Sequence, residues 1–268
     1  DVKKLVAYSS VSHLGFCVLG LFAFNTIGLS GAVLYMINHG LSTGALFLLI
    51  GMVYERYHTR DMNQLGGLAA KMPVWSTFMV FFVMASVGLP GLNGFISEFM
   101  CLLGAFQAGD VWRTHGTFAG IRGGELGPWY AFIAGLGMIV TAIYLLFMLG
   151  KVVWGKLIEP AGHGSHGAHS DHGHNESKAA GHDGGGARGL PTDLCLREIL
   201  ILMPLAVLCL VLGMYPTPVL RTLEAPTNDM ASRLQRARER AELRRDASDS
   251  RHDATSLPAG TPLKEGSH

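Results

Sequence analysis

The feature that most constrains this chain is a long stretch without charge: residues 5–54 contain no Asp, Glu, Lys or Arg. Two further uncharged runs cover residues 126–150 and 199–220. Each run can cross the roughly 30 Å of hydrocarbon in a bilayer, since a membrane helix needs about 20 mainly apolar residues. Soluble domains do not keep such runs free of charge. The sequence therefore predicts an all-α, polytopic membrane protein.

The apolar runs predict five transmembrane helices within a bundle that covers residues 1–220. Pro73 and Pro128 suit the first turn of a helix, where a missing N–H costs nothing. The first residues already lead into a membrane helix, so we expect the chain to be the C-terminal part of a longer protein, unless the sequence itself is truncated. The predicted helices cover about residues 5–24, 30–54, 73–106, 128–151 and 194–214.

The composition of two other segments predicts that they are soluble and poorly ordered. Residues 160–189 are rich in His and Gly, and clustered imidazoles can bind Zn or Ni. The intervening glycines offer no rigid geometry, so we favour a low-complexity loop over a metal site. Residues 221–268 are dense in Arg, Glu and Asp, and we expect a disordered or partner-bound tail. The loop histidines are His163, His166, His169, His172, His174 and His182.

The third predicted helix carries the most informative local pattern. Its apolar run, residues 72–106, is interrupted by Gly88, Pro90 and Gly91, and its one charged side chain is Glu98. Proline removes a backbone donor and glycine adds flexibility, so a break is expected here. A carboxylate just past such a break is costly in hydrocarbon and should face a hydrated interior. A broken helix with a buried acid is typical of ion transporters.

Two histidines are the other candidates for proton chemistry. His39 lies in the middle of an uncharged span, where we favour a functional role; His13 is balanced between function and packing. Histidine changes charge near neutral pH and can therefore pass protons. For Ser9, Ser10 and Ser12 we favour the structural interpretation, hydrogen bonds back to their own helix.

Composition excludes several other classes of function. The formal net charge is +1, and no basic patch with interleaved aromatic residues indicates nucleic-acid binding. The four cysteines show no CxxC spacing, and no motif for haem, nicotinamide, flavin or an iron–sulfur cluster is visible. We therefore assign no cofactor, metal or catalytic residue to this chain.

Several segments resemble the antiporter-like membrane subunits of respiratory complex I. They are DVKKLVAYSSVSHLGF at residues 1–16, HGL, ALFL and YERYHTR within residues 39–60, and GLPG with GFISEF within residues 88–99. The resemblance is dense over residues 1–107 and looser through the last two predicted helices. It does not extend to the histidine-rich loop or the tail.

This resemblance implies a fold and a role for particular residues. Members of the family have fourteen membrane helices and two inverted five-helix repeats, each with one broken helix, so the present helices would be the tenth to fourteenth. The resemblance makes Glu98 the ionisable residue linked to proton exit, and His13 and His39 members of a polar axis through the membrane. Sister chains have lysine at the position of Glu98, and some have lysine at that of Thr43. These differences favour the M-type branch, the counterparts of mitochondrial subunit 4.

The resemblance also implies an activity, a location and partners. The expected function is a proton-translocating membrane-arm subunit of NADH:quinone oxidoreductase in the bacterial inner membrane. NADH, FMN, iron–sulfur clusters and quinone would then sit on other subunits. Expected partners are the other complex I membrane subunits, especially the neighbouring antiporter-like chains L and N, and the lipid bilayer. The alternatives are a cation/proton antiporter or hydrogenase-linked membrane subunit, and a scaffold whose broken helix only holds its neighbours.

Overall fold

The computed structural model describes residues 1–108, 126–158 and 193–256. The predicted histidine-rich loop, residues 160–189, lies outside these ranges. The described residues form helices and no named strand, with one isolated β-bridge between Gly66 and Ile158. The helices are α1 (Val2–Phe22), α2 (Thr26–Tyr57), the short 3₁₀ helix η1 (Leu68–Ala70), α3 (Pro73–Val87), α4 (Asn93–Gln107), α5 (Pro128–Val153), α6 (Leu196–Met214) and α7 (Thr217–Ser256).

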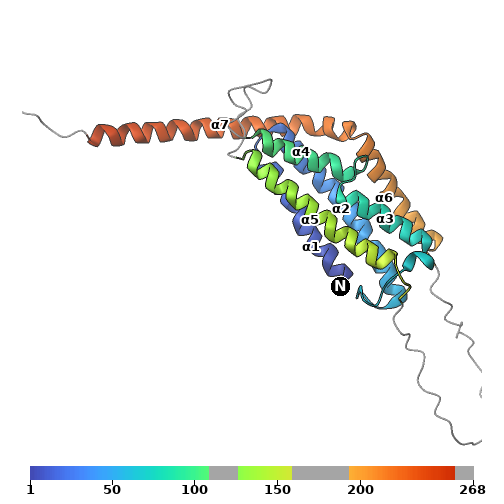
Figure 1. Cartoon of the computed structure of the whole chain (residues 1–268). Coiled ribbons are helices and arrows are strands. Elements are labelled where there is room, and N and C mark those ends of the chain that lie inside the picture. The colour runs from blue at the N-terminus through green and yellow to red at the C-terminus, as the bar shows by residue number, and fades with distance from the viewer. Residues whose placement is uncertain (109–125, 159–192, 257–268) are drawn as a thin grey trace, which may run out of the picture.

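The predicted class, an all-α polytopic membrane protein, is confirmed. Four helices, α1, α2, α5 and α6, are long and apolar enough to cross a bilayer. The third predicted span, residues 73–106, is divided into α3 and α4, with five residues between them. These six helices form one inclined bundle (Figure 1), in which α2 packs against α1, α3, α4 and α6. α2 is therefore the central helix of the bundle.

The start of α2 differs from the prediction because of its cap. The sequence suggested a helix from about residue 30, but α2 begins at Thr26. The Asn25 side chain accepts a hydrogen bond from the Gly28 N–H (2.8 Å) and donates one to the Gly104 carbonyl (2.8 Å). A Cβ at Gly104 would lie 2.5 Å from the Gly28 Cα, so α2 and α4 touch through backbone. Small residues allow this close approach in membrane bundles.

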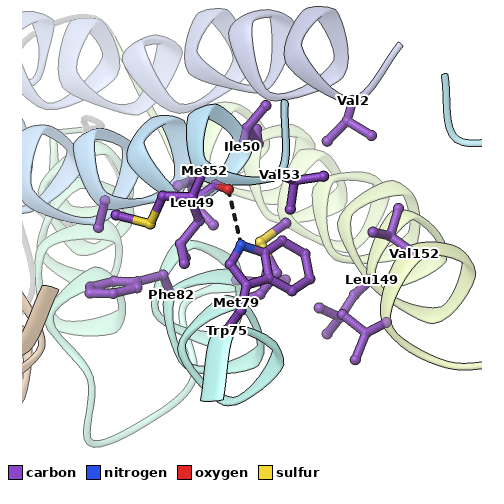
Figure 2. Packing of buried hydrophobic residues seen from close by; sticks show 14 of the residues in the cluster. Val2, Leu49, Ile50, Met52, Val53, Trp75, Met79, Phe82, Leu149 and Val152 are labelled. Atoms are coloured by element: carbon purple, nitrogen blue, oxygen red, sulfur yellow. Dashed lines mark hydrogen bonds between the residues drawn. The ribbon is translucent and has the colours of Figure 1, made fainter. Parts of the chain in front are cut away.

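The hydrophobic core at the other end of the bundle is built around Trp75 (Figure 2). The indole N–H of Trp75 donates to the Leu49 carbonyl (3.0 Å), which satisfies its single polar atom inside the core. Side chains from α1, α2, α3 and α5 surround it: Val2, Ile50, Met52, Val53, Met79, Phe82, Leu149 and Val152.

Charged residues fasten the same end of the bundle. The Arg56 guanidinium donates to both carboxylate oxygens of Glu198 (3.0 and 2.7 Å), and this bidentate pair links α2 to α6. Asp193, which precedes α6, accepts from the backbone N–H groups of Val74 and Trp75 (2.7 and 3.1 Å). Asp193 thus supplies a cap for the first turn of α3, whose own N-cap residue makes no side-chain cap hydrogen bond.

Over residues 221–256 the structure has a helix where we expected a disordered or partner-bound tail, and residues 257–268 lie outside the described ranges. α7 continues from Thr217 to Ser256 and crosses one end of the bundle before extending past it (Figure 1). Its first part packs on α2, where the Ser30 hydroxyl donates to Thr227 (3.2 Å) and Ala231 is buried. The sequence beyond is rich in Arg, Ala, Glu and Leu, which are strong helix formers, and this composition favours a helix despite the high charge.

Replacing Glu198 by Ala should lower the free energy of unfolding by about 2–4 kcal/mol, because Arg56 is left partly buried without its bidentate partner. Denaturant unfolding of the protein in mixed micelles measures this. Glu224→Ala, at an exposed site on α7, is the matched control and should change stability little. Equal effects of the two substitutions would contradict the assigned role of the ion pair.

Candidate functional site

The helix break between α3 and α4 has defined hydrogen bonding. Gly88 ends α3 in the left-handed region, with φ of +82°. The chain then turns back, and the Leu89 N–H donates to the Met84 carbonyl (3.1 Å). Glycine favours this conformation because it lacks a Cβ, and the bond satisfies a carbonyl that the end of the helix leaves free. The backbone at the break is therefore partly paired within protein, as a membrane interior requires.

A tight turn completes the break. The Leu92 N–H donates to the Leu89 carbonyl (3.0 Å), which places Pro90 and Gly91 at the two central positions. Gly91 has φ of +95°. A proline at the second position and a glycine with positive φ at the third position are typical of a type II turn. The three residues predicted to interrupt the helix thus each occupy a position suited to their chemistry.

α4 begins alongside the last turn of α3, and glycines make this overlap possible. A Cβ at Gly94 would lie 2.2 Å from the Ala85 carbonyl oxygen. A Cβ at Gly88 would lie 2.5 Å from Oε2 of Glu98. Gly88 therefore has two functions in the fold: it turns the backbone, and it leaves room for a carboxylate.

Glu98 is held inside the bundle, with 2% of its surface exposed. Its Oε1 accepts a hydrogen bond from the hydroxyl of Tyr35 on α2. His13 on α1 lies close to both groups: its Nδ1 is 2.7 Å from the Tyr35 hydroxyl and 3.5 Å from Glu98 Oε1. Both the acid and the imidazole side chain are about 3% exposed. The structure thus brings two of the predicted residues, from helices α1 and α4, to one buried tyrosine.

His39, the third predicted residue, lies beside this group and not at its centre. Its ring centroid is 5.3 Å from that of His13 and 6.2 Å from that of Tyr35. The ring is half-buried, and a ring nitrogen lies 3.2 Å from the Thr43 hydroxyl one turn along α2. Its hydrogen-bond partner is therefore on its own helix, while its neighbours in space belong to the buried group.

A pair of buried asparagines fixes the register between α2 and the start of α4. The Asn38 side chain donates to the Asn93 carbonyl (2.7 Å), and the Asn93 side chain donates to the Asn38 carbonyl (3.1 Å). Asn38 also donates to the Ser97 hydroxyl (3.0 Å). Tyr35 lies three residues before Asn38 and Glu98 five residues after Asn93, so this clamp positions the hydroxyl against the carboxylate.

Two of the serine hydroxyls of α1 bond within their own helix, and a third contacts another helix. Ser9 and Ser10 donate to the Val6 carbonyl (2.8 and 3.4 Å), which is the structural role expected for them. Ser12 instead lies 3.2 Å from the Thr141 hydroxyl on α5. The serine-rich face of α1 therefore also links the site to α5.

Some buried polar atoms of this site have no hydrogen-bond partner among the described residues. They include the second carboxylate oxygen of Glu98 (Oε2) and the second ring nitrogen of His13 (Nε2). A buried polar atom without a partner is costly, so such atoms mark places where water or a mobile proton can bind.

Sequence reasoning missed Tyr35, Asn38 and Asn93 as members of the site. Tyr35 lies four residues before His39, so both occupy one face of α2, and this spacing was an available signal. The asparagines act across helices, and no local pattern connects them.

No group of three or more His, Cys, Asp or Glu side chains arranged to hold a metal ion occurs in the described ranges. The histidine-rich loop, with His163 to His182, lies outside those ranges. The four cysteines, all within them, are free: Cys17, Cys101, Cys195 and Cys209.

A multi-pass helical membrane protein with a buried acid beside a broken span is the class that this fold and site define. Comparisons with known proteins identify its family. Residues 1–121 match the family described as NADH:quinone oxidoreductase/Mrp antiporter, transmembrane. NADH-quinone oxidoreductase subunit M of Rhodobacter capsulatus is 37% identical over 82% of this chain and 34% of the relative. Subunit M of Escherichia coli is 35% identical over 83% of this chain and 35% of the relative.

Solved structures agree with the sequence relatives. A chain of respiratory complex I from Thermus thermophilus with bound NADH matches 87% of this chain and 39% of its own length, with a TM-score of 0.62 and 29% identity. A chain of the Mrp complex from Dietzia matches 84% of this chain and 42% of its own length, with a TM-score of 0.63 and 23% identity, which supports the fold alone.

The chain belongs to this family of antiporter-like membrane subunits, and it is a multi-pass protein of the bacterial inner membrane. Both relatives are named subunit M, and this is the branch of the family that Glu98 and Thr43 favoured in the sequence. The chain spans about a third of the length of these relatives.

Gly94→Ala should lower stability by about 2–3 kcal/mol, because the added methyl meets a backbone oxygen that cannot move without opening the break. Gly135→Ala on α5 is the control, since nothing lies within 4 Å of its added Cβ, and it should be neutral or slightly stabilising. Thermal unfolding of both variants in the same detergent measures the difference. A Gly94→Ala protein as stable as the control would disprove the close overlap of α3 and α4.

Proposed function

We propose that this chain is part of a proton-translocating membrane-arm subunit of NADH:quinone oxidoreductase, in which Glu98, His13 and His39 carry protons through the membrane. The observation that supports this most is the burial of Glu98 in a membrane bundle, in contact with Tyr35 and close to His13. Burying an ionisable residue inside a membrane costs free energy, and residues buried in this way usually serve ion or proton transfer.

The positions of the three residues support one order in which a proton passes between them. His39 is half-buried, its ring lies 5.3 Å from that of His13, and Nδ1 of His13 lies 3.5 Å from Glu98 Oε1. Imidazole can accept a proton on one nitrogen and release another from the second, so histidines placed in series suit transfer over distance. Glu98 is then the last group of this path on the side of the helix break, as expected of a residue linked to proton exit.

The broken helix has a role in the same proposal. Gly88, Pro90 and Gly91 form the hinge, because the two glycines hold backbone conformations that other residues rarely adopt. Movement there alters the space around Glu98 Oε2, which lies against Gly88. A change of hydration or charge on one side of the break can thus reach the carboxylate.

The free-energy scale of this proposal is modest. Moving one elementary charge against a membrane potential costs about 2.3 kcal/mol per 100 mV. One or two charge-assisted hydrogen bonds to a buried group are worth a similar amount, at about 1.5–3 kcal/mol each. Making or breaking such a bond at Glu98 is therefore large enough to drive a proton step.

The proposal places redox chemistry elsewhere. NADH, FMN, iron–sulfur clusters and quinone would be bound by other subunits, and their reactions would act on this chain through the polar axis. The neighbouring antiporter-like chains L and N are the proposed partners. α5 presents apolar side chains to its surroundings, among them Phe132, Ile139 and Phe147, and these suit contact with lipid or with another membrane subunit.

Glu98→Gln in the complete enzyme complex should lower NADH-driven proton uptake into proteoliposomes at least about tenfold, since the amide keeps the shape but carries no exchangeable acid proton. Assembly and detergent stability should be retained. Glu224→Gln on the exposed face of α7 is the control. Normal uptake in Glu98→Gln would remove this residue from the mechanism, and normal uptake after loss of both Glu98 and His39 would support a scaffold.

A further inference from the structure

Tyr35 connects the two groups that the proposed function assigns to neighbouring steps. Its hydroxyl donates to Oε1 of Glu98 and lies 2.7 Å from Nδ1 of His13. The tyrosine is buried to 2% exposure, so this hydroxyl has no access to bulk water. It is therefore a one-atom bridge between an imidazole and a carboxylate.

With Glu98 ionised, counting donors assigns the protons. A phenol has one O–H, and here it is used toward Glu98. The hydroxyl oxygen can then only accept from His13, so Nδ1 of His13 carries a proton. The neutral imidazole has one N–H, which leaves Nε2 as a bare acceptor. That nitrogen is buried, with no hydrogen-bond partner in the part of the chain that the structure describes.

Distances favour the bridge over a direct transfer. His13 Nδ1 lies 3.5 Å from Glu98 Oε1, which is longer than the 2.7–3.2 Å of ordinary N–H···O hydrogen bonds. The contact through the Tyr35 hydroxyl is 2.7 Å on the histidine side. The rate of proton transfer falls steeply as the donor–acceptor distance grows. Transfer through Tyr35 is therefore faster than direct transfer from His13 to Glu98.

We propose that Tyr35 is the proton relay between His13 and Glu98, an inference that rests on the proposed function. A proton binds Nε2 of His13, Nδ1 passes its proton to the Tyr35 oxygen, and the phenol passes its own proton to Glu98 Oε1. One proton enters, Glu98 becomes a neutral acid, and His13 and Tyr35 each end with the number of protons they began with. Release of the proton from Glu98, rotation of the hydroxyl and the return of His13 from its Nε2–H to its Nδ1–H tautomer restore the starting state.

Packing holds the relay in place. The Tyr35 ring meets Phe16 edge to face, at 6.2 Å between centroids, and belongs to an apolar cluster with Cys17, Ala32 and Cys101. This cluster leaves the hydroxyl as the polar end of an otherwise apolar contact. His13 and Glu98 are therefore the groups with which the bridge exchanges protons, since both lie within hydrogen-bond distance of the hydroxyl.

The test is Tyr35→Phe in the complete complex, with NADH-driven proton uptake into proteoliposomes as the readout. The variant keeps the ring and removes the bridge, so the expected loss is at least about tenfold. Tyr54→Phe, on the same helix at its exposed end, is the matched control and should pump normally. Uptake in Tyr35→Phe equal to that of the control would overturn the relay.

Two further measurements separate the possible failures. If Glu98→Gln abolishes uptake while Tyr35→Phe does not, the relay is wrong and the proposed function survives; if Glu98→Gln pumps normally, the proposed function itself fails. Should Tyr35→Phe not assemble, site-specific fluorotyrosine at position 35 keeps the packing and changes only the acidity of the phenol. A changed uptake rate with normal assembly supports the relay, and an unchanged rate overturns it.

Discussion

A carboxylate inside an apolar bundle needs space and a hydrogen-bond donor, and the rest of this structure depends on how both are supplied to Glu98. Space comes from the helix break, where Gly88 has no side chain at the point that the carboxylate occupies. The donor comes from Tyr35 on the central helix. The break and the acid are thus one feature: a continuous helix with a Cβ at position 88 would displace the carboxylate that the site requires.

Keeping that feature in register requires contacts from several helices. The reciprocal bonds between Asn38 and Asn93 hold α2 against the first turn of α4. Close packing of Gly28 on Gly104 does the same at the far end of α4. These contacts are backbone-to-backbone or side chain-to-backbone, so they tolerate little sliding. The acid is consequently placed by helix packing and not by its own rotamer alone.

The sequence predicted most of the architecture because its strongest signals are local. Uncharged runs determine membrane spans whatever their partners are, and Gly88, Pro90 and Gly91 specify a turn by their own backbone preferences. The sequence also marked Glu98 and His39 as candidates, since polar groups are rare in such runs. The role of Tyr35 was not, because a tyrosine in an apolar helix is more often packing, and its partners lie on other helices. For the tail, disorder was favoured over a helix because its charge was weighed above its many helix-forming residues.

The central claim is that Glu98 gains and loses a proton during turnover. Infrared difference spectroscopy of the complete complex, with the glutamate carboxyl groups isotope-labelled, tests this most directly. The account predicts a carboxylic-acid carbonyl band that appears on energisation with NADH, shifts with the label and is absent from the Glu98→Gln variant. A difference spectrum identical in the two proteins would contradict it.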